Sequence, residues 1–112
     1  MRLPNASKAI VERKKIVDYL LNPAHPDNGG KAQFFDKLKF HRKGWKTLAE
    51  ALRTLASETE VTDSMKSPHG EKYAIIGRIA SPAGKTPLVR TIWIIDSGAN
   101  AARLVTAYPH EE

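Results

Sequence analysis

The segment NPAHPDNGGKAQFF, residues 22 to 35, holds a histidine and a lysine that could do chemistry. His25 lies between two prolines in an expected loop between two helices, and imidazole exchanges protons near neutral pH. Lys31 follows two glycines at the expected start of a helix, where free backbone N–H groups and the helix dipole favour an anion. We therefore predict His25 as a catalytic acid or base, and Lys31 as its cationic partner in holding a phosphate.

Two other interpretations of this segment bear on its function. A P-loop would carry Ser or Thr after the lysine, but Ala32 occupies that position, so the sequence does not favour ATP or GTP binding. The segment is also compatible with a purely structural turn. In that case the two prolines stiffen the connection, His25 fills space or caps a backbone group, and Lys31 is solvated.

A second group of candidates lies in the apolar C-terminal half of the chain. Arg90 and Thr106 are predicted to hold phosphate. A buried arginine without a partner costs on the order of several kcal/mol, so Arg90 is expected to have a carboxylate or phosphate partner. Thr91 and Tyr108 are predicted as further substrate contacts. Arg90 and Thr91 must point to opposite faces of their strand, so the four cannot share one cleft without a bulge or a strand end. Threonine and tyrosine are also good strand formers, which leaves a structural role open for them.

The positive charge of the chain is concentrated in its middle. Of a net charge of +6, residues 31 to 54 contribute seven Lys or Arg against two Asp or Glu, a local excess of five. Lys37, Arg42 and Lys43 are predicted to attract a polyanionic substrate, because phosphate contacts dominate nonspecific affinity for nucleic acid. The alternative is that these residues form an ordinary solvated helical surface.

The composition narrows the classes of protein. The 112 residues include no cysteine, which excludes disulfides and thiolate metal sites and fits a reducing compartment. Four histidines are scattered without metal-ligand spacing, so we predict no metal and no cofactor. The longest apolar runs are far shorter than the roughly 20 residues of a membrane helix, and the N-terminus lacks a signal-peptide pattern. We expect no membrane span and a cytoplasmic location.

Changes in hydrophobic period along the chain indicate which elements position these residues. Helical spacing of apolar residues predicts helices over 12–21, 31–38 and 43–57. Residues 3 to 11 fit either an extended segment or an earlier helical turn, and we favour the extended one. Beyond Ser57 the β-branched residues predict strands at 61–66, 71–80, 88–96 and 103–108, with short turn-rich connections.

Helices followed by strands predict an α+β fold, in which N-terminal helices pack on one face of a four-stranded antiparallel β-sheet. We expect a single domain over residues 1–112. Residues 1–57 are expected to be mainly helical, residues 58–109 to form the sheet, and residues 110–112 to be a tail.

Motifs across nearly the whole chain resemble a bacterial family of unknown function. These are YLLNPAHPDNGGKAQFF, with the pattern HPxxGxKAxFF, the helix GWKTLAEALR, and VRTIWIIDSG followed by RLVTAYP. The expected architecture places helices before a four-stranded sheet in a small basic chain. In this respect the protein is similar to the barnase, EndoU, colicin and RelE group of metal-independent ribonucleases, many of which are toxins. Such a likeness of fold does not by itself confer function.

The architectural resemblance implies a metal-independent endoribonuclease, a toxin-like domain that cleaves RNA by 2′-hydroxyl attack. It also implies an acidic immunity or antitoxin protein as a partner. Two alternatives stay open. One is a noncatalytic interaction or accessory module that uses exposed strand edges. The other is a nonspecific nucleic-acid-binding domain built on residues 31 to 54.

Overall fold

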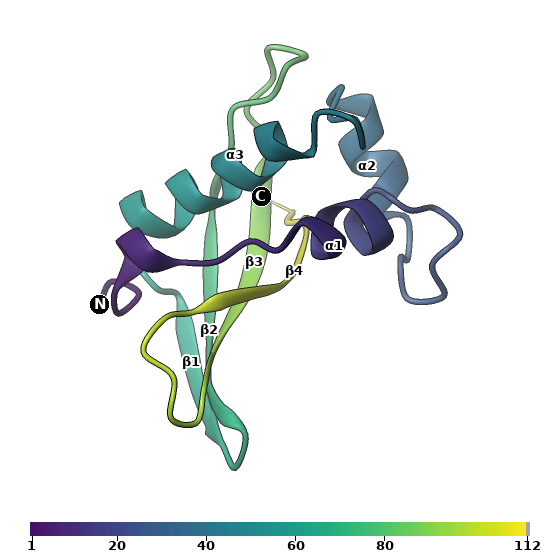
Figure 1. Cartoon of the computed structure of the whole chain (residues 1–112). Coiled ribbons are helices and arrows are strands. Elements are labelled where there is room, and N and C mark those ends of the chain that lie inside the picture. The colour runs from purple at the N-terminus through teal and green to yellow at the C-terminus, as the bar shows by residue number, and fades with distance from the viewer. Residues whose placement is uncertain (112) are drawn as a thin grey trace.

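The computed structural model describes residues 1–111 as a helical layer on one face of an antiparallel sheet (Figure 1). In chain order the elements are η1 (Ala6–Lys8), α1 (Arg13–Lys15), η2 (Ile16–Leu20), α2 (Lys31–Lys37), α3 (Trp45–Glu58), β1 (Asp63–Ser67), β2 (Gly70–Arg78), β3 (Leu88–Asp96) and β4 (Arg103–Pro109). The α+β prediction is confirmed, and the predicted strands agree with the observed ones to within two residues. Among the described residues, no helix is both long enough and apolar enough to cross a membrane.

The sheet is a meander of order β1-β2-β3-β4, with every neighbouring pair antiparallel. Arg90 of β3 lies opposite Tyr108 of β4, and Ile92 lies opposite Thr106. One step further Trp93 pairs with Leu104, so β4 carries an extra residue, a bulge that reverses the alternation of side chains. The bulge turns Thr106 and Tyr108 to the same face as Arg90.

The core lies between the sheet and the helical layer. On α3 the apolar side chains recur with helical spacing and are fully or almost fully buried: Leu48, Ala49, Leu52, Leu55 and Ala56. They belong to one cluster with Trp93, Ile75 and Leu104 from the sheet. Gly77 permits close packing here, because a Cβ at this position would lie 3.1 Å from the Thr59 hydroxyl oxygen.

The N-terminal segment runs along the sheet edge. Both alternatives for this segment occur: a helical turn, η1, comes first, and the favoured extended conformation follows it. The N–H of Ile10 donates to the Ala102 carbonyl at 2.8 Å, and the N–H of Leu104 donates to the Ile10 carbonyl at 2.9 Å. This parallel bridge covers part of the β4 edge. The opposite edge strand, β1, is exposed at all five residues.

The first predicted helix is present, but its second half widens. α1 leads directly into η2, a π-helical turn in which the N–H of Leu21 donates to the Ile16 carbonyl at 2.8 Å. Ile16, Val17 and Leu20 remain buried. π-turns are rare and often occur at functional sites. Here the turn carries Tyr19, a residue at the centre of the candidate site described below.

α2 ends in a Schellman motif that leaves a lysine in a strained conformation. The N–H of Phe40 donates to the Phe35 carbonyl at 3.1 Å, and the N–H of Lys39 donates to the Asp36 carbonyl at 2.8 Å. The Phe35 and Phe40 rings contact each other with centroids 6.1 Å apart. Lys39 therefore adopts φ = 65°, in the left-handed region that normally favours glycine.

Replacing this lysine by glycine is expected to stabilise the protein. Lys39→Gly removes a left-handed penalty of about 1 to 2 kcal/mol and adds an unfolded-state entropy cost of about 0.5 to 1 kcal/mol. The free energy of unfolding, measured in urea, should therefore rise by about 0.5 to 1 kcal/mol. The control is Lys37→Gly at the last residue of α2, which removes the same charge but should lower stability by up to about 1 kcal/mol. A loss of stability in both variants would contradict this account of Lys39.

Candidate functional site

The loop from Asn22 to Gly30 is built around one buried amide. Asn28 is only 2% exposed, and its Nδ2 donates to the Tyr19 carbonyl at 2.6 Å and to the Leu20 carbonyl at 3.4 Å. Its Oδ1 accepts from the N–H of Ala32 at 2.9 Å. These bonds provide partners for backbone carbonyls at the end of η2 and for a backbone N–H at the start of α2. Asn28 thus fixes where the loop carries His25 and Lys31.

Lys31 stands at the first position of α2, as predicted, but part of its anion site is already occupied. Its backbone N–H donates to the Asn28 carbonyl, and the next N–H is bound by Asn28 Oδ1. Two of the backbone N–H groups that were expected to be free for a phosphate are therefore already bonded within the chain. The ammonium donates to the carbonyls of Asp27 at 3.2 Å and Asn28 at 3.1 Å, which leaves one of its three N–H groups for a ligand.

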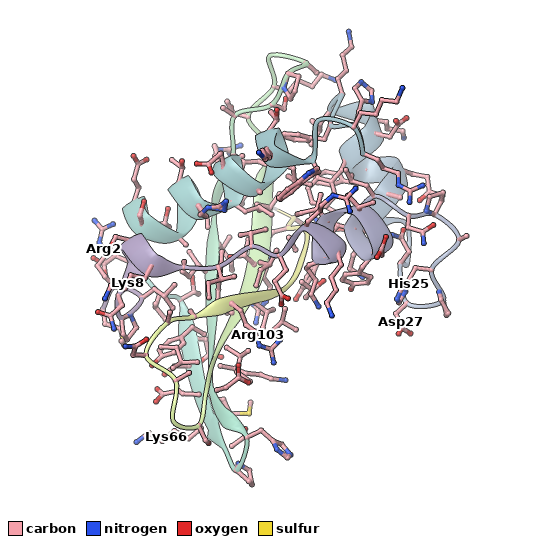
Figure 2. The ribbon with its side chains drawn as sticks, in the orientation of Figure 1. Arg2, Lys8, His25, Asp27, Lys66 and Arg103 are labelled. Atoms are coloured by element: carbon pink, nitrogen blue, oxygen red, sulfur yellow. The ribbon has the colours of Figure 1, made fainter. Side chains whose placement is uncertain are left out.

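His25 lies half-buried on the same loop, and Figure 2 shows it beside Asp27 at the outer end. Its Nδ1 accepts from the Asp27 N–H at 3.0 Å. This bond selects the neutral tautomer with the proton on Nε2, so the ring presents a donor in this state. For Nε2 to act as a base, the proton must move to Nδ1 and the Asp27 bond must break.

Tyr19 connects the loop to the sheet. Its hydroxyl lies 2.9 Å from Thr106 Oγ1 in a hydrogen bond, and its ring meets the His25 ring edge-on at 4.9 Å between centroids. The ammonium groups of Lys15 and Lys31 lie 5.3 and 5.4 Å from the centre of the Tyr19 ring, within cation–π range. Tyr19 therefore contacts three of the four side chains that were predicted to carry out the reaction or to hold its phosphate: His25, Lys31 and Thr106, but not Arg90.

Two hollows flank this cluster. One, of about 200 Å³, is lined by Tyr19, His25, Lys14, Lys15 and Asp18. The other, of about 410 Å³, is lined by Lys31 and Tyr108 together with neighbouring backbone. Tyr19 connects the two hollows, because it lines the first and bonds Thr106, which is two residues from Tyr108 on the same face of β4. We call the edge formed by Tyr19, His25, Lys31, Thr106 and Tyr108 the β4 edge site.

Arg90 lies opposite Tyr108, but its side chain lines a separate small hollow of about 120 Å³, with Asp63 and Lys72 among its other residues. Its Nε is buried and has no hydrogen-bond partner within the described chain. Such an orphan donor is costly and is suited to an anion. The guanidinium of Arg103, by contrast, is paired with Asp96 at 2.8 Å, and this hydrogen bond lowers the pKa of the Asp96 carboxyl.

Thr91 does not belong to the β4 edge site. It is fully buried on the helix-facing side, where its hydroxyl donates to the Ile75 carbonyl at 2.9 Å and accepts from the Trp93 indole N–H at 2.8 Å. A substrate cannot reach this hydroxyl in the folded chain. The structure therefore gives Thr91 the structural role that its strand propensity allows.

Lys37, Arg42 and Lys43, the basic residues predicted to attract a polyanion, also lie outside the β4 edge site. Arg42 and Lys43 line a hollow of about 580 Å³ between α2, the start of α3 and the β2–β3 loop. Lys37 is exposed on the last turn of α2. None of the three lines a hollow of the β4 edge site.

Sequence reasoning missed Tyr19 and Asn28. Tyr19 fits an ordinary helix position, although its place three residues before the Asn22-Pro23 break could have drawn attention to it. Asn28 reads as a turn residue before two glycines. As for metals, no group of three or more His, Asp or Glu side chains that could hold an ion occurs in residues 1–111.

Comparisons with known proteins place this geometry in a family and a fold. A search of curated proteins finds no match. Among solved structures, the chain matches one from a contact-dependent growth inhibition toxin–immunity protein complex of Klebsiella pneumoniae 342, with a TM-score of 0.74 and 15% identity. The match covers 96% of this chain and 97% of that one, and at this identity it shows a shared fold. Residues 2–111 match the family described as Domain of unknown function (DUF6883), and the chain belongs to that family.

Proposed function

We propose that this protein is a toxin-like, metal-independent endoribonuclease that cleaves RNA at the β4 edge site. The observation that carries the proposal is the meeting of His25, Lys31 and Thr106 around Tyr19, from segments up to 87 residues apart in sequence. A proton-transfer group, a cation and hydroxyl donors are the parts that phosphodiester cleavage requires in the absence of a metal.

The proposed reaction follows from these parts. The ribose 2′-oxygen attacks phosphorus and gives its proton to His25 Nε2, after the ring has exchanged its Asp27 bond for the Nδ1–H tautomer. Lys31 stabilises charge on the phosphorane, and Thr106 and Tyr108 donate to its oxygens. The bond from phosphorus to the 5′-oxygen breaks, and that oxygen takes a proton from the imidazolium. The products are a 2′,3′-cyclic phosphate and a 5′-hydroxyl.

Arg90 has a second place in the proposal. Side chains directly opposite each other on antiparallel strands begin about 5 Å apart, so Arg90 starts beside Tyr108 on the sheet face away from the helices. We assign the Arg90 guanidinium to the phosphate of an adjacent nucleotide. Its Nε is buried, so the side chain must move out of its hollow before this unpartnered N–H can reach the phosphate. RNA would thus run from the loop, over Tyr108, towards β2.

The charge of the chain favours the toxin-like function over an immunity-like one. The solved complex that shares this fold joins a toxin with an immunity protein. A net charge of +6 and a pI near 9.7 suit a protein that binds a polyanion. The acidic protein in such a pair would then be the partner of this chain.

The direct test is cleavage of a labelled RNA by the purified protein in excess EDTA. We expect fragments with 2′,3′-cyclic phosphate ends, identified by mass, and no cleavage of an RNA whose ribose 2′-oxygens are methylated, because the attacking hydroxyl is then blocked. Intact RNA after long incubation at micromolar protein, or cleavage that stops in EDTA, would refute the proposed mechanism.

A further inference from the structure

A second concave surface runs along α2, away from the residues of the β4 edge site. The hollow of about 580 Å³ and a neighbouring one of about 290 Å³ share Leu21, Ala32 and Asp36, so they form one continuous depression. It extends from Pro23 beside α2 to Pro82 in the β2–β3 loop. We call this depression the α2 groove.

The floor of the α2 groove is apolar and closed. Leu21, Ala32 and Phe40 contribute to it, and they are 6%, 5% and 2% exposed. The Phe40 ring is too buried to stack on a nucleotide base. A small apolar side chain entering from solvent would find a matching surface there, as anchor residues do in peptide grooves.

The rim at one end of the groove is cationic. Lys39, His41, Arg42 and Lys43 line it, and Asp36 is the one carboxylate among the described lining residues. Lys39 lies on this rim with φ = 65°, a backbone conformation in which glycine would be less strained than lysine. Strain held by a charged residue at the edge of a hollow points to a function that requires the charge.

We propose that the α2 groove binds an acidic peptide segment of a partner protein, with an apolar residue of that segment on the floor and its carboxylates against Lys39, Arg42 and Lys43. The opposite charges of the rim and the peptide should make the interaction selective and speed up association. The apolar floor is the feature that favours a peptide over RNA, because an RNA backbone would gain from the rim and not from the floor. The inference does not depend on RNA cleavage at the β4 edge site.

The test uses two fluorescein-labelled synthetic peptides, (Glu-Glu-Leu)₄ and (Glu-Glu-Gly)₄, and a 12-nucleotide 2′-O-methyl oligouridylate, with affinity measured by anisotropy. We expect (Glu-Glu-Leu)₄ to bind the wild type at least about fivefold more tightly than the glycine peptide, since only leucine can use the floor. The double variant Arg42→Glu/Lys43→Glu should weaken binding of the leucine peptide by about tenfold or more. On addition of the leucine peptide, the largest changes in amide chemical shift should occur at and around Ala32, Lys39 and Lys43.

The matched control is Lys8→Glu/Lys66→Glu, which changes the net charge equally at two exposed positions that Figure 2 shows near the N-terminus and on the β1–β2 hairpin. We expect it to weaken peptide binding by less than about twofold. No binding of (Glu-Glu-Leu)₄ by the wild type, or equal losses in both double variants, would overturn the proposal. It would also be overturned if the oligonucleotide lost as much affinity as the peptide in Arg42→Glu/Lys43→Glu, because the groove would then be an RNA surface.

Discussion

His25→Ala is expected to reduce RNA cleavage by about 10² to 10⁴-fold, the range that a positioned general acid or base contributes. The ring is half-buried against Tyr19 and its Nδ1 accepts from Asp27, so the substitution removes both the proton-transfer group and one loop contact. The measurement is the rate of product formation in EDTA at saturating RNA. The melting temperature of each variant is recorded alongside, to show that the protein remains folded.

A second substitution separates chemistry from loop structure. In His25→Asn the side-chain oxygen can still accept from the Asp27 N–H, because asparagine makes this local bond readily, but an amide cannot transfer a proton near neutral pH. His25→Asn should therefore keep the stability of the wild type and lose activity as His25→Ala does. His69→Ala, at an exposed turn, should cleave at the wild-type rate. Recovery of most of the activity in His25→Asn would show that His25 only shapes the loop.

The elements of this fold could be predicted from sequence because their signals are local. The period of 3.6 on α3 and the β-branched runs of β2 and β3 determine which residues are buried, and antiparallel pairing follows from the short connections. Alternation along β3 likewise fixed Arg90 and Thr91 on opposite faces, as the structure shows. What alternation could not reveal was the bulge in β4, because one extra residue leaves no strong trace in composition.

The candidate site could be predicted only in part, because its contacts are long-range. His25, Lys31 and Thr106 were recognisable as polar residues in unusual places, but the bond from Tyr19 to Thr106 depends on how η2 docks beside β4. The π-turn that presents Tyr19 is not predicted by hydrophobic spacing, since residues 16, 17, 20 and 21 fit either helix. Arg90 was expected to need a partner, yet the direction of its side chain became clear only from the hollow that it lines.

Asn28→Ala is expected to lower the free energy of unfolding by about 2 to 4 kcal/mol, because it leaves the buried Ala32 N–H and Leu20 carbonyl without their Asn28 partner. The Tyr19 carbonyl loses its 2.6 Å bond and keeps only the Asn22 N–H. This is a large part of the roughly 5 to 15 kcal/mol that stabilises a typical domain. Urea denaturation gives the change from the midpoint at constant slope. RNA cleavage should also fall in the protein that remains folded, since the same amide positions both His25 and Lys31.

The matched control is Asn22→Ala at the other end of the same loop. Asn22 also uses both ends of its amide, donating to the Asp18 carbonyl at 3.1 Å and accepting from the Ala24 N–H at 3.0 Å, but both bonds are exposed to water. Water can replace them, so the loss should be about 0.5 to 1 kcal/mol. Burial is the physical difference between the two asparagines. Equal losses in the two variants would mean that Asn28 is one turn residue among others, and the loop that carries His25 and Lys31 would then lack the internal support inferred for it.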